Sequence, residues 1–79
     1  MAPTAEMILD FNMAYGQLTG YSFNCQVFND DSSFHLLFNG QYVGTIDSNK
    51  NGVLEQTNGV PIPETTLTLI KERIINFYG

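Results

Sequence analysis

A tight turn flanked by two strand-like runs constrains the fold more than any other feature of this sequence. The segment is "FHLLFNGQYVGTI", which covers residues 34–46. Its centre, Asn39-Gly40, is a dipeptide in which both residues tolerate positive φ, and its flanks are rich in aromatic and β-branched residues. The segment therefore predicts a β-hairpin.

The turn leaves two strand registers open. A two-residue loop would pair Leu37 with Tyr42. A three-residue loop with a bulge at Gly40 would instead gather four apolar residues on one face: Phe34, Leu36, Tyr42 and Ile46. We favour the three-residue loop, because it places more apolar surface on a single side of the sheet.

Other segments add strands on both sides of this hairpin. Two of them alternate apolar and polar residues with the two-residue period of a strand. The first has an apolar face of Met7, Leu9, Phe11, Met13 and Tyr15, and the second has Tyr21, Phe23, Cys25 and Val27. A polar loop over residues 29–33 precedes the hairpin. Residues 53–57 follow it as a short polar strand that suits a sheet edge, before a turn at Asn58-Gly59.

The last part of the sequence has the period of a helix. From Leu67 onward, apolar residues recur every three or four positions, which is typical of an amphipathic helix. Pro63 suits the first helical position, and Glu64 suits the positive end of the helix dipole. We predict a helix over residues 63–78, with Ile74 buried against the sheet.

These elements predict one small α+β domain over residues 1–79. It consists of an N-terminal tail (residues 1–6), an antiparallel β-meander of four to five strands, and a C-terminal helix packed across one face. The segment from Phe38 to Gly79 joins "FNGQYVGTI" to a polar turn, a second glycine turn and a helix that ends in an aromatic residue. In this it resembles short bacterial β-meander-plus-C-terminal-helix proteins of unknown function. The resemblance implies the same fold and no known activity.

Composition excludes several classes of protein. Hydrophobic residues make up 43% of the chain and charged residues 14%, which is too apolar for a disordered segment. Eight acidic and three basic residues give a net charge of −5. Three cations cannot neutralise a nucleic-acid backbone or an anionic membrane surface, so we expect neither partner. The start, "MAPTAEMILD", lacks the pattern of a signal peptide, and we expect a cytoplasmic protein.

The segment "DSNKNG", Asp47–Gly52, matches the start of an EF-hand calcium loop, with oxygen-bearing side chains at alternate positions and glycine sixth. The twelfth position, where a bidentate glutamate is expected, is Asn58, and the flanking segments are strand-like rather than helical. Two interpretations stay open, a β-turn and a weak calcium-binding module. The ligands of such a module would be Asp47, Asn49, Asn51 and Glu55.

Catalytic residues are scarce in this chain. Cys25 and His35 are the conventional candidates, and strand parity predicts that Cys25 points into the core while His35 points to solvent. Structural zinc needs four Cys or His ligands, and the chain has one of each. We therefore expect a protein that is not an enzyme and needs no cofactor.

One helix cannot cover both faces of a sheet, so some apolar residues are left over. The interface residues that we predict from strand parity are Ile8, Phe28 and Leu37. Gathered on the uncovered face, they would suit a protein partner or a second copy in a homodimer. The predicted function is therefore binding or self-association.

Overall fold

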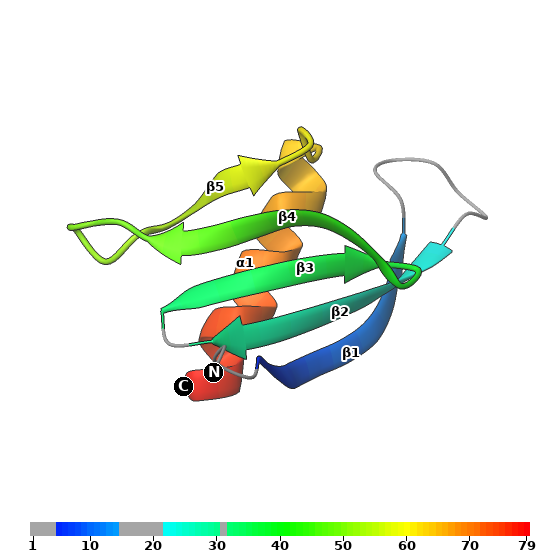
Figure 1. The fold of residues 1–79 in the computed structure, drawn as a ribbon, viewed down its shortest axis with the longest axis horizontal. Coiled ribbons are helices and arrows are strands. Elements are labelled where there is room, and N and C mark those ends of the chain that lie inside the picture. Colours follow the sequence, from blue (N-terminus) through cyan, green and yellow to red (C-terminus); the bar gives the residue numbers. More distant parts are fainter. Residues whose placement is uncertain (1–4, 15–21, 31) are drawn as a thin grey trace.

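The computed structural model describes residues 5–14, 22–30 and 32–79. Its elements, in chain order, are β1 (Glu6–Ala14), β2 (Ser22–Asp30), β3 (Ser33–Phe38), β4 (Gln41–Ser48), β5 (Leu54–Gly59) and α1 (Glu64–Tyr78). The strands form one five-stranded sheet in the order β1-β2-β3-β4-β5, and every neighbouring pair is antiparallel. Figure 1 shows α1 running across the strands behind the sheet. The predicted α+β meander with one C-terminal helix is confirmed, and β5 lies at an edge as expected.

Several element ends differ from the prediction. Pro63 has φ −52° and ψ 138°, so it precedes α1 as the N-cap residue instead of starting the helix. β1 begins at Glu6, inside the predicted tail. β2 continues to Asp30 within the predicted loop, and Gly59 ends β5 where a turn was expected. The predicted strand positions of Tyr15 and Tyr21 lie outside the described residues.

The hydrophobic core lies between α1 and the sheet face that the helix covers. Its buried residues are Met13, Phe23, Cys25, Val27, Leu36, Ile46, Ile70 and Ile74. Cys25 is fully buried, which confirms its predicted place in the core. Burial raises the pKa of its thiol to about 12. Ile74 is 2% exposed, so the prediction that it packs under the sheet is also confirmed.

The hairpin uses the two-residue loop, so the register that we favoured is wrong. Asn39 has φ 51° and Gly40 has φ 82°, the left-handed pair of angles whose twist matches that of the flanking strands. Leu37 accordingly pairs with Tyr42, but the register then shifts so that Leu36 pairs with Gly44. Val43 is the extra residue. This bulge keeps the apolar alternation toward the core on both strands and turns Tyr42 to the other face.

A second bulge, in β1, changes the face of Met7. Met7 pairs with Phe28, whereas Leu9 pairs with Val27, so Ile8 is the extra residue between them. The predicted stripe that joined Met7 to Leu9 on one face is therefore wrong. Met7 is 50% exposed, while Ile8 is partly buried and packs against the core.

Candidate functional site

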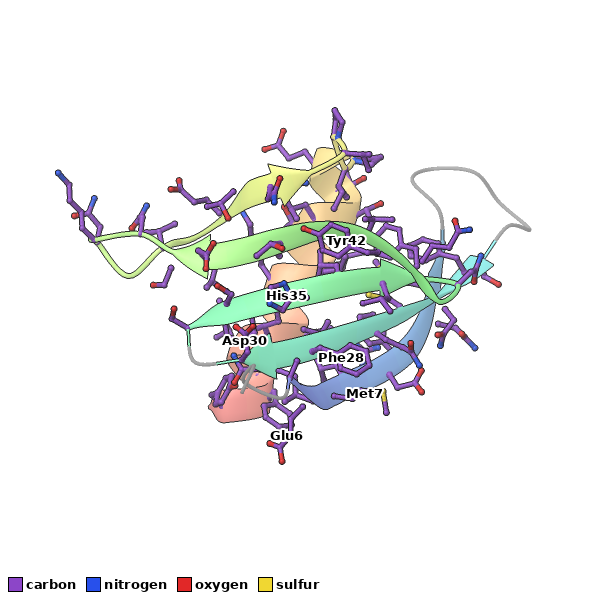
Figure 2. The ribbon with its side chains drawn as sticks, in the orientation of Figure 1. Glu6, Met7, Phe28, Asp30, His35 and Tyr42 are labelled. Atoms are coloured by element: carbon purple, nitrogen blue, oxygen red, sulfur yellow. The ribbon has the colours of Figure 1, made fainter. Side chains whose placement is uncertain are left out.

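The face of the sheet opposite α1 carries the candidate site, and we call it the outer face. Two neighbouring rows of side chains cross its centre from strand to strand. The first row, on β1 to β4, is Met7, Phe28, His35 and Thr45. The second row contains the register partners Leu37 and Tyr42. Figure 2 looks onto this face and shows Met7, Phe28, His35 and Tyr42 in front of the strands.

A chain of hydrogen bonds joins three strands on the outer face. The Asp30 Oδ2 atom lies 2.8 Å from His35 Nε2, and His35 Nδ1 lies 3.0 Å from Thr45 Oγ1. Thr45 Oγ1 in turn lies 2.6 Å from the hydroxyl of Tyr42. His35 and Asp30 are both half-buried. Each of these four side chains therefore has a hydrogen-bond partner, as buried polar groups require.

For a neutral imidazole, the donors and acceptors of these hydrogen bonds can be assigned from the carboxylate end. An ionised carboxylate only accepts hydrogen bonds, so His35 Nε2–H donates to Asp30. In a neutral imidazole the other nitrogen is then an acceptor, and the Thr45 hydroxyl donates to Nδ1. Thr45 Oγ1 is left to accept a hydrogen bond from the Tyr42 hydroxyl.

This arrangement of carboxylate, imidazole and hydroxyl has the parts of a catalytic triad. A nucleophile must reach its substrate, however, and Thr45 is only 7% exposed. Its oxygen is also shared with Tyr42. These hydrogen bonds therefore serve as a clamp between strands, and they hold Tyr42 and Asp30 in fixed positions on the outer face. Cys25 is on the opposite face of the sheet from His35, so the two predicted catalytic candidates are not brought together.

A second clamp is centred on Asp47. Ser33 Oγ donates to Asp47 Oδ1 at 2.5 Å, and Thr57 Oγ1 donates to Asp47 Oδ2 at 2.5 Å. These two hydrogen bonds, Ser33 first, hold the pKa of the Asp47 carboxyl below its ordinary value. The register places Glu55 directly across from Asp47 on β5. The clamp thus ties β3, β4 and β5 together beside the first one.

The "DSNKNG" segment forms the connection between β4 and β5. Asn49 Oδ1 accepts hydrogen bonds from the backbone amides of Asn51 (2.8 Å) and Val53 (3.0 Å), and Gly52 has φ 81°. The side-chain oxygens of Asp47 and Asn49, which calcium would need, already accept hydrogen bonds within the protein. No group of three or more His, Cys, Asp or Glu side chains with metal-site geometry occurs among the described residues. The geometry favours the turn interpretation.

Of the three predicted interface residues, the structure brings two to the outer face. Phe28 and Leu37 lie there in adjacent rows, each half-buried. Ile8 instead packs against the core, and Met7 takes the place opposite Phe28 because of the bulge in β1. Sequence reasoning missed Met7 and Tyr42 for the same reason, since each lies next to a bulge that reverses strand parity. We call Met7, Phe28, Leu37 and Tyr42 together the outer apolar group.

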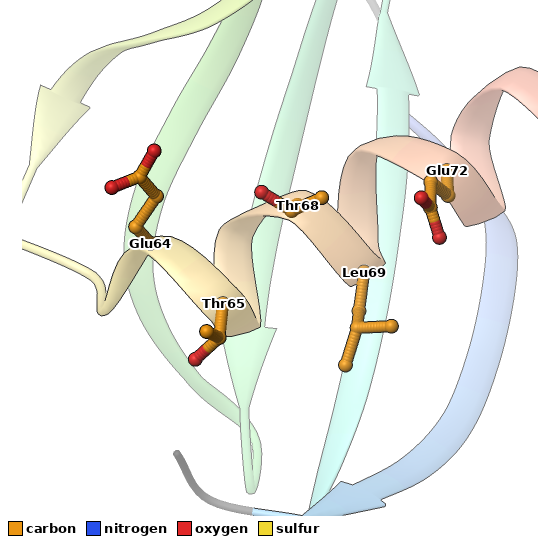
Figure 3. Close-up of a pocket in the computed structure, with 5 residues that line it drawn as sticks. All are labelled: Glu64, Thr65, Thr68, Leu69 and Glu72. Carbon is orange, nitrogen blue, oxygen red and sulfur yellow. The ribbon is translucent and has the colours of Figure 1, made fainter. Parts of the chain in front are cut away.

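Two hollows lie away from the outer face. One, of about 430 Å³, is lined by Phe34, Ser48, Gly52, Leu54, Ile74, Ile75, Tyr78 and Gly79. The other, of about 480 Å³, runs along α1 and is lined by Glu64, Thr65, Thr68, Leu69 and Glu72 (Figure 3). All of these last five residues belong to α1, so within the described part of the chain this hollow has no second wall to enclose a ligand.

No protein-family model matches this chain, and no curated protein or solved structure is significantly similar to it. In the described part of the chain, no helix is long and apolar enough to cross a membrane.

Proposed function

We propose that this protein is a non-catalytic binding domain whose outer face contacts another protein chain. One observation carries the proposal: the outer apolar group lies on a sheet face that α1 does not cover. Met7 is 50% exposed and Tyr42 is 51% exposed. Their neighbours Phe28 and Leu37 extend this surface across four strands. An apolar group of this kind, rimmed by polar side chains, is typical of an interaction surface.

The clamps on the outer face support the same proposal. Asp30, His35 and Thr45 hold the Tyr42 hydroxyl, so the tyrosine ring keeps its position before a partner arrives. Aromatic side chains that are fixed in this way lose little conformational entropy on binding, and Tyr is enriched among residues that dominate binding energies.

Photo-crosslinking tests this function. A benzoylphenylalanine residue replaces Leu37 on the outer face or, as the control, Leu69 on α1, which is also a surface leucine. We expect adducts with a second chain from position 37 and few from position 69. Equal yields from both positions, or no adduct from position 37 in cells that express the protein natively, would contradict the proposal.

A further inference from the structure

The sheet separates the charges of this protein. Four carboxylates lie on the outer face by strand register: Asp10, Asp30, Asp47 and Glu55. The chain has three basic residues, and all of them lie elsewhere. Lys50 is in the connection between β4 and β5, and Lys71 and Arg73 are on α1. The Arg73 guanidinium lies 4.4 Å from the centre of the Phe11 ring, on the helix side of the sheet.

Three of these carboxylates form a row next to the outer apolar group. Asp30 pairs with Ser33, Ser33 pairs with Asp47, and Asp47 pairs with Glu55. We call Asp30, Asp47 and Glu55 the acidic row. It crosses the strands parallel to the two rows that contain the outer apolar group. The outer face therefore offers an apolar stripe with three carboxylates along one flank, while Asp10 lies on the other side, in the row of Leu37.

The proposal that follows rests on the binding function proposed above and names the partner. We propose that the outer face binds a basic amphipathic helix of another protein, with its apolar residues on the outer apolar group and its Lys or Arg residues along the acidic row. Opposite charges on the two surfaces would steer and orient the partner.

Charge argues against a second copy on this face. A two-fold interface brings the same surface patch of both chains together. A two-fold axis that runs across the rows would bring Asp30, Asp47 and Glu55 against the same row of the second chain, and neither outer face carries a Lys or Arg to pair with them. Repulsion between these like charges would disfavour a second copy as the partner.

Dimensions argue for a helix. Neighbouring strands lie roughly 4.8 Å apart, so the outer apolar group spans about 14 Å from β1 to β4. At about 1.5 Å per residue, some ten helical residues, or nearly three turns, cover this distance. Apolar positions on one side of such a helix recur every three or four residues and form a stripe of matching length. α1 crosses the other face of the same sheet in this way (Figure 1).

Peptide titration followed by amide NMR tests this inference. The probe is a 14-residue helical peptide with leucines along one face and lysines along one flank. The controls are its counterpart with glutamate for lysine, and a scrambled peptide of the same composition. We expect saturable shifts confined to β1–β4 with the basic amphipathic peptide, at least tenfold weaker binding of the scrambled peptide, and no binding of the acidic one.

Matched variants locate the charge effect. Asp47→Asn with Glu55→Gln removes two charges from the acidic row, and Glu64→Gln with Glu72→Gln removes two from α1. We expect the first pair to weaken binding of the basic peptide about tenfold at low salt, and the second pair to leave it within about twofold. Equal losses from both pairs would reveal unspecific attraction to net charge and overturn the inference.

The two proposals fail in different ways. Concentration-dependent dimerisation through the outer face, measured by sedimentation and by shifts in β1–β4, would overturn the basic-helix partner but support the binding function. Equal binding of the basic and the scrambled peptide would also overturn the basic-helix partner. A crosslinked partner at position 37 would then still support the binding function. Absence of any peptide shift, self-association or crosslink at the outer face would overturn both.

Discussion

Gly44 of β4 and Gly59 of β5 are register partners, and the backbone of β4 leaves no room for a side chain at Gly59. A Cβ atom at Gly59 would lie 2.2 Å from the carbonyl oxygen of Val43 and 2.3 Å from the Gly44 Cα atom. The close approach lets the Val60 amide donate to the Val43 carbonyl at 2.9 Å. It fixes the end of β5 immediately before the chain leads into α1.

Gly59→Ala should therefore be among the most damaging single substitutions in the chain. Its φ of 102° is unfavourable for a side chain, and the new Cβ atom would collide with backbone. We expect a loss of about 2–4 kcal/mol in the free energy of unfolding, measured by urea denaturation. Gly52→Ala is the control, because Gly52 has φ 81° but nothing within 4 Å of its added Cβ. It should lose about 1 kcal/mol, and equal losses at both positions would show that the close approach has no role.

A pair of neighbouring isoleucines tests how α1 packs. Ile74 is 2% exposed and Ile75 is 59% exposed. Ile74→Ala should lower the free energy of unfolding by about 2–5 kcal/mol because it opens a cavity under the sheet. Ile75→Ala should change it by less than about 1 kcal/mol. The same denaturation experiment measures both, and a small loss for Ile74→Ala would mean that α1 does not pack against the sheet as described.

The fold could be predicted because local patterns and global topology agree. The Asn39-Gly40 turn, the alternation through residues 22–28 and the helical spacing from Leu67 each specify their own element. Short connections then leave a meander as the simplest arrangement. Phe28 is on the predicted face because alternation in β2 is unbroken.

The candidate site could be predicted only in part, because a bulge reverses which residues face the core. Parity counted from Leu9 places Met7 in the core, and the extra residue Ile8 puts it on the outer face. Val43 does the same to Tyr42. The hydrogen-bond chain from Asp30 to Tyr42 depends on pairing between three strands, and no short sequence motif encodes such pairing.

The clamp through Thr45 makes a prediction about stability. Thr45→Val keeps the shape of the side chain but removes its hydroxyl, so His35 Nδ1 and the Tyr42 hydroxyl lose their partner. We expect a loss of about 1–3 kcal/mol in the free energy of unfolding, since the site is largely buried. Tyr42→Phe keeps the bond between Thr45 and His35 and should lose less than about 1 kcal/mol. A loss for Tyr42→Phe as large as that for Thr45→Val would contradict the central position of Thr45 between His35 and Tyr42.

The buried thiol predicts both slow labelling and a loss of stability in alkali. The thiolate is the reactive form, and burial raises the pKa of Cys25 from 9.0 to about 12. At pH 8 a disulfide reagent should label the native protein far more slowly than the protein unfolded in urea. The folded state holds the proton more tightly, so the contribution of the Cys25 thiol to stability is complete below pH 9 and is lost between pH 9 and pH 12. Rapid native labelling would instead favour a reactive cysteine.

The clamp around Asp47 predicts a loss of stability in acid. Hydrogen bonds from Ser33 and Thr57 hold the pKa of Asp47 below its ordinary value in the folded state. The carboxylate therefore contributes stability above about pH 4, the ordinary range of an aspartate, and this contribution disappears as the pH falls through the folded-state pKa. Ser33→Ala removes one donor and should raise the pKa of Asp47, which a carboxyl ¹³C NMR titration measures directly. Ser48→Ala, at an exposed serine next to Asp47, is the matched control and should leave that pKa unchanged. If Ser33→Ala also left it unchanged, the hydrogen bond from Ser33 would not be the main cause of the lowered pKa.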